Sequence, residues 1–197
     1  MIRPPIKIGI TGTHSTGKST FFDALEQELK RSGLIVCRIS DIARAALSLG
    51  FPILTKHTFE STLWIMAECM RRETEASLTS DVILVDRPVI DALGYLRAAL
   101  QVSHRELDER RLDELATIVK AHTPDYDLLI ATFLDKSVEI GKGRDPDTEF
   151  RDAAGRHINM LVSELTPDAL RLTSSNGRDV LKQTVMFIIS RLPTAAS

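Results

Sequence analysis

Short apolar runs alternate with amphipathic patterns along the chain. The runs are rich in β-branched residues, which is typical of strands buried within a parallel sheet, and we expect strands at residues 6–11, 34–40, 82–85, 128–134 and 169–173. Between them, apolar residues recur at the three- and four-residue spacing of helices. This alternation predicts an α/β fold, in which helices cover a parallel sheet.

The helical patterns place seven helices between and after these strands. We expect them at residues 20–30, 41–49, 58–77, 90–100, 104–121, 152–165 and 180–192. Asp41 stands where it can cap the second of these helices. Residues 135–151 show weak periodicity, glycines and several cations, and we expect a loop there.

Length, composition and charge narrow the class of protein. A chain of 197 residues, 43% of them hydrophobic and 26% charged, suits one soluble domain, residues 1–197. A formal charge of −2 provides no basic field for nucleic acid or an anionic membrane. The apolar runs are too short for a membrane span, and the first residues do not form a signal peptide, so we expect a cytoplasmic protein. The oligomeric state stays open, a homodimer included.

The segment Gly12–Ser19, GTHSTGKS, fits the phosphate-loop pattern G-x-x-x-x-G-K-[ST] between a predicted strand and a predicted helix. In such a loop, main-chain amides surround a phosphate, the lysine contacts the β- and γ-phosphates, and the hydroxyl coordinates Mg²⁺. We therefore predict that Lys18 is catalytic and that Ser19 is a metal ligand. The predicted nucleotide-binding residues are Gly12, Thr13, His14, Ser15, Thr16, Gly17, Lys18, Ser19 and Thr20.

Asp86 and Arg87 follow the apolar run 82–85. Because ligands of open α/β sheets bind at the carboxyl ends of the strands, both residues are site candidates. Asp86 can hold Mg²⁺ or accept a proton, and Arg87 can grip a phosphate or an acceptor oxygen. The alternative is that Asp86 caps the next helix and Arg87 is its surface partner.

Asp41 and Arg44 follow the second predicted strand and lie three residues apart, on one helix face. If that face points into the cleft, Asp41 is a general base and Arg44 positions the acceptor. The alternative is a helix cap with an intrahelical ion pair.

A cluster of cations in residues 136–151 predicts a lid over the transferred phosphoryl group. We assign Arg144 to catalysis and Arg151 to the substrate, with Lys136 and Lys142 beside them. The alternative is a basic surface loop.

Together these segments resemble P-loop kinases of the nucleoside and nucleotide kinase superfamily. The resemblance is carried by Gly12–Ser19, Asp41–Arg44, Asp86–Pro88, Arg144–Asp147 and Phe150–Arg151, in that order. It is strongest to the ribosylnicotinamide-kinase-like group of small kinases and ATPases.

The resemblance implies a three-layer P-loop NTPase fold with a five-stranded parallel sheet, ATP and Mg²⁺ as cofactors, and a small-molecule acceptor. A nucleoside, ribosylnicotinamide or a nucleoside monophosphate all suit it. The group usually has glutamate where this chain has Asp41; we assign Asp41 as the base and Asp86 as the magnesium ligand. Phe59, Trp64 and Tyr95 are candidates for the acceptor wall or for plain core.

Two other classes of protein share the phosphate loop. GTPase switches carry D-x-x-G at the third strand, where this chain has Val89 in place of the glycine, so a GTPase is disfavoured. An ATPase or nucleotide-sensing module that acts on a protein partner stays as the alternative to a kinase.

Overall fold

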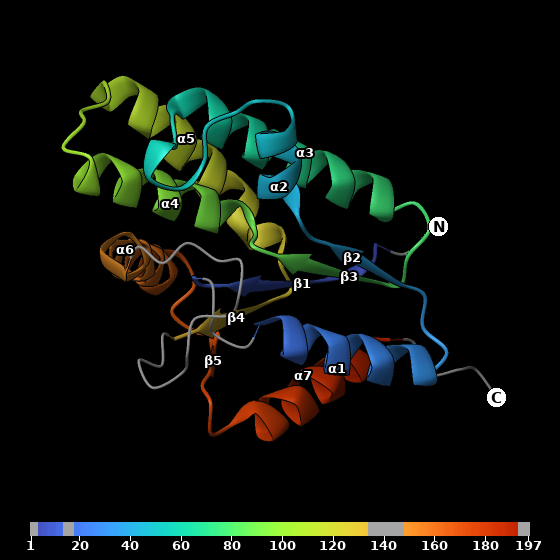
Figure 1. Ribbon diagram of the computed structural model, residues 1–197. Helices are drawn as coiled ribbons and strands as arrows, with labels where there is room; N and C mark the ends of the chain where they lie inside the picture. The colour runs from blue at the N-terminus through green and yellow to red at the C-terminus, as the bar shows by residue number, and fades with distance from the viewer. Residues whose placement is uncertain (1–3, 14–17, 134–147, 193–197) are drawn as a thin grey trace.

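The computed structural model describes residues 4–13, 18–133 and 148–192 (Figure 1). Within these residues, five parallel strands form one sheet in the order β2-β3-β1-β4-β5. The strands are β1 (Ile6–Thr11), β2 (Val36–Ile39), β3 (Val82–Asp86), β4 (Leu128–Thr132) and β5 (Leu170–Leu172). The predicted five-stranded parallel sheet is confirmed.

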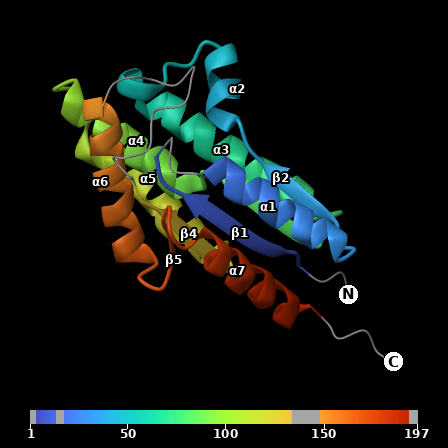
Figure 2. The same ribbon diagram turned by 60° about the horizontal axis from the view of Figure 1, so that its bottom comes forward.

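Helices cover both faces of this sheet (Figures 1 and 2). Helices α1 and α7 lie on one face, and α2 to α6 lie on the other. Their bounds are α1 (Lys18–Arg31), α2 (Ile42–Ser48), α3 (Phe59–Ala76), α4 (Val89–Val102), α5 (Glu109–His122), α6 (Thr148–Leu165) and α7 (Gly177–Arg191), with short 3-10 helices η1 (Leu54–Lys56) and η2 (Thr123–Asp125). The layers are those of the predicted three-layer fold.

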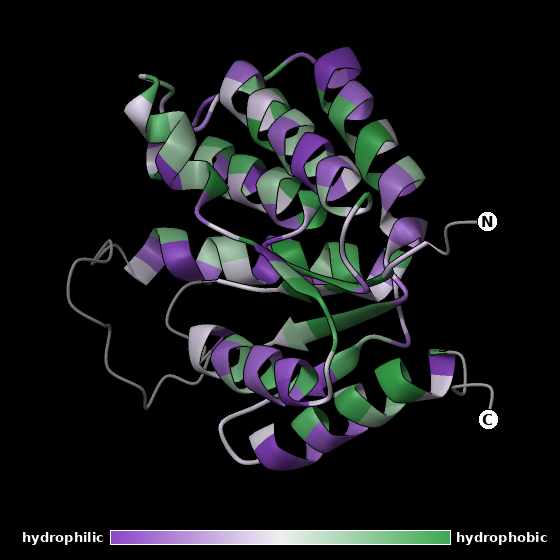
Figure 3. Ribbon diagram, turned by 90° about the vertical axis from the view of Figure 1, so that its right-hand side faces the viewer, coloured by the Kyte–Doolittle hydropathy of each residue, from purple (hydrophilic) through white to green (hydrophobic). Residues whose placement is uncertain are grey.

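The core is split by the sheet into two apolar clusters. Phe22 and Leu25 of α1 pack on the first face, and Leu93 of α4 and Phe150 of α6 pack on the second, all fully buried. The apolar stripes of the helices turn toward the sheet, and their polar residues face outward (Figure 3). Burial of both faces explains why β3 and β4 are nearly continuous apolar runs.

Helices α5 and α6 begin four or five residues away from the positions that the sequence pattern predicts. Helix α5 begins at Glu109 rather than at His104, because the Asp108 side chain caps it by accepting the Arg110 N–H at 2.8 Å. Helix α6 begins at Thr148, so the last four residues of the predicted lid, 148–151, form its first turn. In the part of the chain that the structure describes, no helix is long and apolar enough to cross a membrane.

The register brings the carboxyl ends of the three central strands to one edge. Ile10 of β1 lies beside Asp86 of β3 and Ile130 of β4. The chain leaves β1 at Gly12 on this edge, toward α1. The residues that end β1, β3 and β4 are therefore close in space, as a site at the carboxyl edge requires.

Candidate active site

Gly12 is the first residue after β1, and its place admits no side chain. Its φ of 126° lies in a region that residues with a side chain rarely adopt. A Cβ here would lie 2.8 Å from the Thr132 carbonyl oxygen and would collide with the Thr132 hydroxyl. That hydroxyl donates to the Thr11 carbonyl at 2.9 Å, which ties β4 to the end of β1. The glycine at this position therefore has a steric cause.

Lys18 lies against the start of the same loop. It is the first residue of α1, its exposed fraction is 6%, and its ammonium donates to the Gly12 carbonyl at 2.8 Å and to the Thr13 carbonyl. Ser19 and Thr20 follow on the helix and are exposed. The two described ends of the loop are therefore joined, at the carboxyl end of β1 and the first turn of α1. His14, Ser15, Thr16 and Gly17 lie outside the described residues.

Asp86 ends β3, as predicted, and one of its oxygens has an unusual environment. Its Oδ1 is buried and has no hydrogen-bond partner among the residues that the structure describes. Burial of a carboxylate oxygen without a hydrogen-bond donor costs free energy. Such an oxygen is therefore a candidate for contact with a bound cation or ligand. Among the described residues, no group of three or more acidic, histidine or cysteine side chains could hold a metal ion by itself.

Arg87 follows Asp86 with a left-handed backbone, at φ 67°. Its Nη1 donates to the Tyr95 hydroxyl at 2.6 Å and to the Gly12 carbonyl at 3.2 Å, and its guanidinium lies 5.1 Å from the centre of the Tyr95 ring. Burial acts against the charge, but Tyr95, Asp91 and Asp86 together raise the pKa of Arg87 above its ordinary value. Arg87 is therefore a fixed cation between the loop and the pocket described below.

Asp91, in the first turn of α4, is a buried carboxylate that the sequence analysis missed. Its exposed fraction is 2%; Oδ1 accepts the Thr11 hydroxyl, and Oδ2 accepts the Gly12 N–H at 3.2 Å. Burial raises the pKa of Asp91 to about 6, although Arg87 and Lys18 act in the opposite direction. The signal in the sequence was an acid within an apolar helix, four residues after Arg87.

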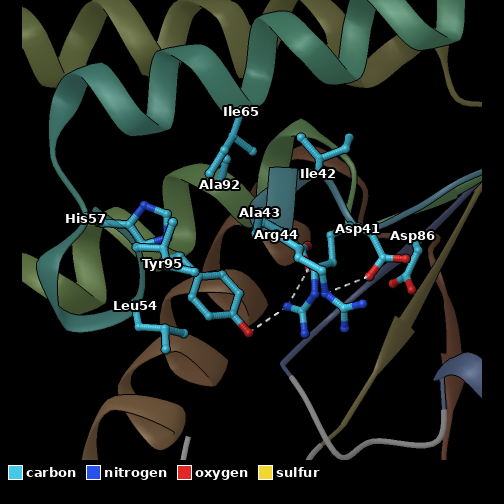
Figure 4. Close-up of a pocket in the computed structure, with 13 residues that line it drawn as sticks. Asp41, Ile42, Ala43, Arg44, Leu54, His57, Ile65, Asp86, Ala92 and Tyr95 are labelled. Carbon is cyan, nitrogen blue, oxygen red and sulfur yellow. Dashed lines mark hydrogen bonds and ion pairs between the residues drawn. The ribbon is translucent and has the colours of Figure 1, made fainter. Parts of the chain in front are cut away.

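A cavity of about 300 Å³ opens beside these groups (Figure 4). Apolar side chains of α2, η1, α3 and α4 line much of it, and polar groups gather toward the ends of β2 and β3. The lining residues are Asp41, Ile42, Ala43, Arg44, Ile53, Leu54, His57, Ile65, Asp86, Arg87, Asp91, Ala92 and Tyr95. Asp41, Arg44, Asp86 and Arg87, which the sequence analysis selected, thus share one pocket.

Asp41 and Arg44 stand at the exposed part of this pocket. Their side chains are 63% and 83% exposed, and the carboxylate lies 3.7 Å from the guanidinium Nε. Asp41 occupies the N-cap position of α2, but its φ is 59° and its side chain makes no capping hydrogen bond, so the predicted cap is wrong. An exposed pair of this kind contributes little stability, which leaves both groups able to meet a ligand.

His57 is a second pocket residue that the sequence analysis missed. It is 3% exposed, and burial together with Arg105 lowers its pKa to about 4, so the ring is neutral at physiological pH. Its Nδ1 lies 3.4 Å from the Ser61 hydroxyl, and Arg105 donates to the His57 carbonyl at 2.9 Å. A single histidine between a short turn and a helix cap belongs to no motif, so the sequence alone does not identify His57 as a pocket residue.

The three aromatic candidates separate in space. Tyr95 lines the pocket, whereas Trp64 packs on Phe51 with ring centres 5.5 Å apart, and Phe59 lies under the Arg111 guanidinium at 4.6 Å. Phe59 and Trp64 are not among the lining residues, so Tyr95 is the candidate that walls the cavity.

Most cations of the predicted lid belong to the residues that the structure does not describe. Lys136, Lys142 and Arg144 lie outside the described residues. Arg151 belongs to α6, is 8% exposed, and has a buried Nε that finds no hydrogen-bond partner within the described part of the chain. It is therefore a buried helix residue rather than an exposed lid cation, and its predicted role toward the substrate stays a prediction.

Comparison with protein families agrees with this geometry. A family model described as an AAA domain matches residues 7–172. The chain belongs to this family. The match extends from β1 to β5 and so includes the phosphate loop and every residue that lines the cavity. No curated protein matches the chain in sequence.

Solved structures of similar shape include two kinds of protein. The NadR protein in complex with NR has a TM-score of 0.69 at 11% identity, over 98% of this chain and 54% of that one. Deoxyadenosine kinase from M. mycoides with bound dATP has a TM-score of 0.60 at 13% identity, over 94% of this chain and 99% of that one. The same enzyme with dCTP scores 0.59 at 13% identity, over 95% and 100%.

These likenesses establish the fold. The chain has the P-loop fold of these nucleoside-kinase-like structures, as the sequence resemblance implied. At identities of 11–13% they do not establish its reaction. The chain also spans only about half the length of the NadR protein that it matches.

Proposed function

We propose that this protein transfers the γ-phosphoryl group of ATP, with Mg²⁺, to a hydroxyl group of a nucleoside-like small molecule. One observation carries the proposal. The buried Lys18 ammonium and the Gly12 turn lie next to a cavity of about 300 Å³ that is lined by Asp41, Asp86 and Arg87. A donor loop and an acceptor pocket that share one wall are what phosphoryl transfer requires.

The residues present fit a magnesium nucleotide. Lys18 and the Gly12–Ser19 loop would hold the phosphates, and the Ser19 hydroxyl and the Asp86 carboxylate would hold Mg²⁺. The unpartnered, buried Oδ1 of Asp86 supports this assignment, because a cation would supply its missing partner. When bound, Mg²⁺ offsets the charge of the transferred phosphoryl group.

The acceptor would lie in the cavity, and Asp41 would act as its general base. The acceptor oxygen forms a bond to the γ-phosphorus, the bond to the ADP oxygen breaks, and the hydroxyl proton passes to the Asp41 carboxylate. Arg44 and Arg87 would orient the acceptor and the phosphoryl group. The exposed Asp41 carboxylate at the pocket supports this role, since its ion pair with Arg44 is long and open to solvent.

The lining charges favour an acceptor without a phosphate of its own. Three carboxylates, Asp41, Asp86 and Asp91, face two guanidiniums, those of Arg44 and Arg87. The remaining wall is apolar, and His57 is neutral. A nucleoside or ribosylnicotinamide therefore suits the pocket better than a nucleoside monophosphate.

The test is a panel of nucleosides, ribosylnicotinamide and nucleoside monophosphates with ATP and Mg²⁺, followed by mass spectrometry of the product. We expect one nucleoside-type acceptor to gain a phosphoryl group and to raise ADP release. Lys18→Ala and Asp41→Asn should lose the product, and Asp86→Asn should need much more Mg²⁺. Asp127→Asn is the matched control, because Asp127 precedes β4 and contacts the opposite end of β1. Release of ADP that no acceptor changes would instead indicate an ATPase or a nucleotide-sensing module.

A further inference from the structure

Side chains hold the backbone on both sides of the Gly12 α-carbon. Its N–H donates to Asp91 Oδ2 at 3.2 Å, and its carbonyl accepts from Lys18 Nζ at 2.8 Å and from Arg87 Nη1 at 3.2 Å. Its α-carbon faces Thr132 so closely that a Cβ would not fit. The N–H belongs to the Thr11–Gly12 peptide and the carbonyl to the Gly12–Thr13 peptide. Side chains therefore fix both peptides at the turn from β1 into the phosphate loop.

Asp91 contributes to this arrangement from a different part of the chain. It lies in the first turn of α4, where its neighbours Val89, Ile90, Ala92 and Leu93 are buried apolar residues of the core. A carboxylate at a buried position costs free energy unless hydrogen bonds compensate for the lost water. The compensating donors are the Thr11 hydroxyl and the Gly12 amide, both at the end of β1. The packing of α4 does not itself call for an acid here.

We propose that Asp91 is a positioning residue that orients the Thr11–Gly12 peptide and so prepares the phosphate loop for nucleotide. By accepting the Gly12 N–H, it fixes the Thr11–Gly12 peptide, from which the next peptide extends with its carbonyl toward the Lys18 ammonium. By accepting the Thr11 hydroxyl, it fixes its own carboxylate. Its negative charge also balances the two cations, Arg87 and Lys18, that converge on this carbonyl. The inference rests on the proposed nucleotide-dependent function.

Asp91 differs in this from the carboxylates that we assign to the reaction. It lines the cavity, but both of its oxygens are already occupied by donors of β1 and of the loop. Asp86, in contrast, has an oxygen with no partner, and Asp41 is exposed. Asp91 thus acts through Gly12, and its loss should weaken nucleotide binding more than acceptor binding.

The experiment compares Asp91→Ala and Asp91→Asn with the unaltered chain. Calorimetry with ATP and Mg²⁺ gives the Kd, and steady-state assays give the KM for ATP and for the acceptor. For Asp91→Ala we expect the Kd and KM for ATP to rise at least about tenfold, since two buried hydrogen bonds and a charge are lost. The KM for the acceptor should change less than about threefold, because Asp91 acts through Gly12. A general loss of the fold would instead change both KM values together.

Asp91→Asn should restore most of the affinity for ATP. Its Oδ1 can accept the Gly12 N–H, and its Nδ2 can donate to the Thr11 hydroxyl oxygen after that hydroxyl turns. Asp127→Ala is the matched control. Asp127 precedes β4 and accepts the Lys7 N–H at 2.9 Å, at the end of β1 that is far from Gly12. The Kd for ATP should not change in this control.

A folded Asp91→Ala protein that binds ATP as tightly as the unaltered chain would overturn the proposal. If Asp91→Ala does not fold, Thr11→Val decides, because it removes the second anchor of the carboxylate at nearly constant volume. We expect it to weaken ATP binding about threefold or more, and unchanged binding would refute the role. If the unaltered chain binds ATP but phosphorylates no acceptor, only the proposed function is refuted. The Kd values for ATP still test the role of Asp91 in that case. Absence of ATP binding by the unaltered chain would refute both.

Discussion

Replacement of Glu73 by glutamine should destabilise the protein strongly at neutral pH while leaving the active site intact. Glu73 lies near the end of α3, at the amino edge of the sheet, and its side chain is 1% exposed. One oxygen lies 2.8 Å from Lys7 Nζ and 2.7 Å from His122 Nε2, and the other accepts the Tyr126 hydroxyl at 2.6 Å. The Cys69 thiol donates to the same oxygen as Tyr126 at 3.2 Å.

The pKa of this carboxyl sets the magnitude of the effect. Burial acts to raise the pKa of Glu73, but the hydrogen bonds from His122, Lys7 and Tyr126 outweigh it and lower the pKa from 4.5 to about 2. A difference of about 2.5 pKa units corresponds to about 3 kcal/mol. Because the folded value is depressed, this stability is complete above pH 4.5 and is lost as the pH falls toward 2.

Urea unfolding followed by circular dichroism at several pH values measures this contribution. We expect Glu73→Gln to unfold with about 3 kcal/mol less free energy than the unaltered chain at pH 7, and the gap should narrow steadily between pH 4.5 and pH 2. Glu75→Gln is the control, because Glu75 is 61% exposed and pairs only with solvent-exposed Arg71 among the ion pairs of the described residues. Its cost should stay below about 0.5 kcal/mol. A gap for Glu73→Gln that is under 1 kcal/mol, or the same at every pH, would refute the reasoning.

Three further predictions concern single positions. Gly12→Ala should abolish ATP binding in calorimetry, whereas Gly33→Ala, also at positive φ but with open space around it, should leave binding unchanged and cost about 1 kcal/mol of stability; equal binding by both variants would contradict the steric argument. Gly94→Ala should lower the free energy of unfolding by about 1–2 kcal/mol, because a Cβ there collides with Ile158 of α6 and lies 3.2 Å from its backbone nitrogen. The loss should be smaller in an Ile158→Ala background. Because the pKa of His57 is lowered to about 4, the folded protein should lose up to about 3 kcal/mol as the pH falls from 6.5 toward 4, and His57→Gln should flatten this part of the stability curve.

Local patterns were sufficient for the elements and for the phosphate loop. The five strands lie where the apolar runs predicted them. The pattern is clearest in β3 and β4, because strands buried on both faces need continuous apolar residues. The Gly12–Ser19 pattern was recognisable because its chemistry is carried by contiguous residues. Asp86 could be selected for the same reason, since the end of a buried strand is visible in the sequence.

Other features depended on contacts between distant segments. Arg87 was expected to grip a ligand, yet its guanidinium is directed to Tyr95 and Gly12. Asp91 and His57 entered the site without any sequence signal that we used. Glu73 lies in a helix whose sequence is rich in exposed charges, and nothing in its spacing shows that it is buried.

The sequence by itself determined the order of strands and helices along the chain and the position of the nucleotide loop, because periodicity and the loop motif are properties of neighbouring residues. The tertiary structure alone decided which carboxylates are buried and which donors satisfy them. Gly12, for example, is enclosed by Asp91 of α4, Arg87 after β3 and Thr132 of β4, which lie 75 to 120 positions away along the chain. Burial and hydrogen-bond partners depend on which distant segments come into contact in the fold, and local sequence patterns do not show these contacts.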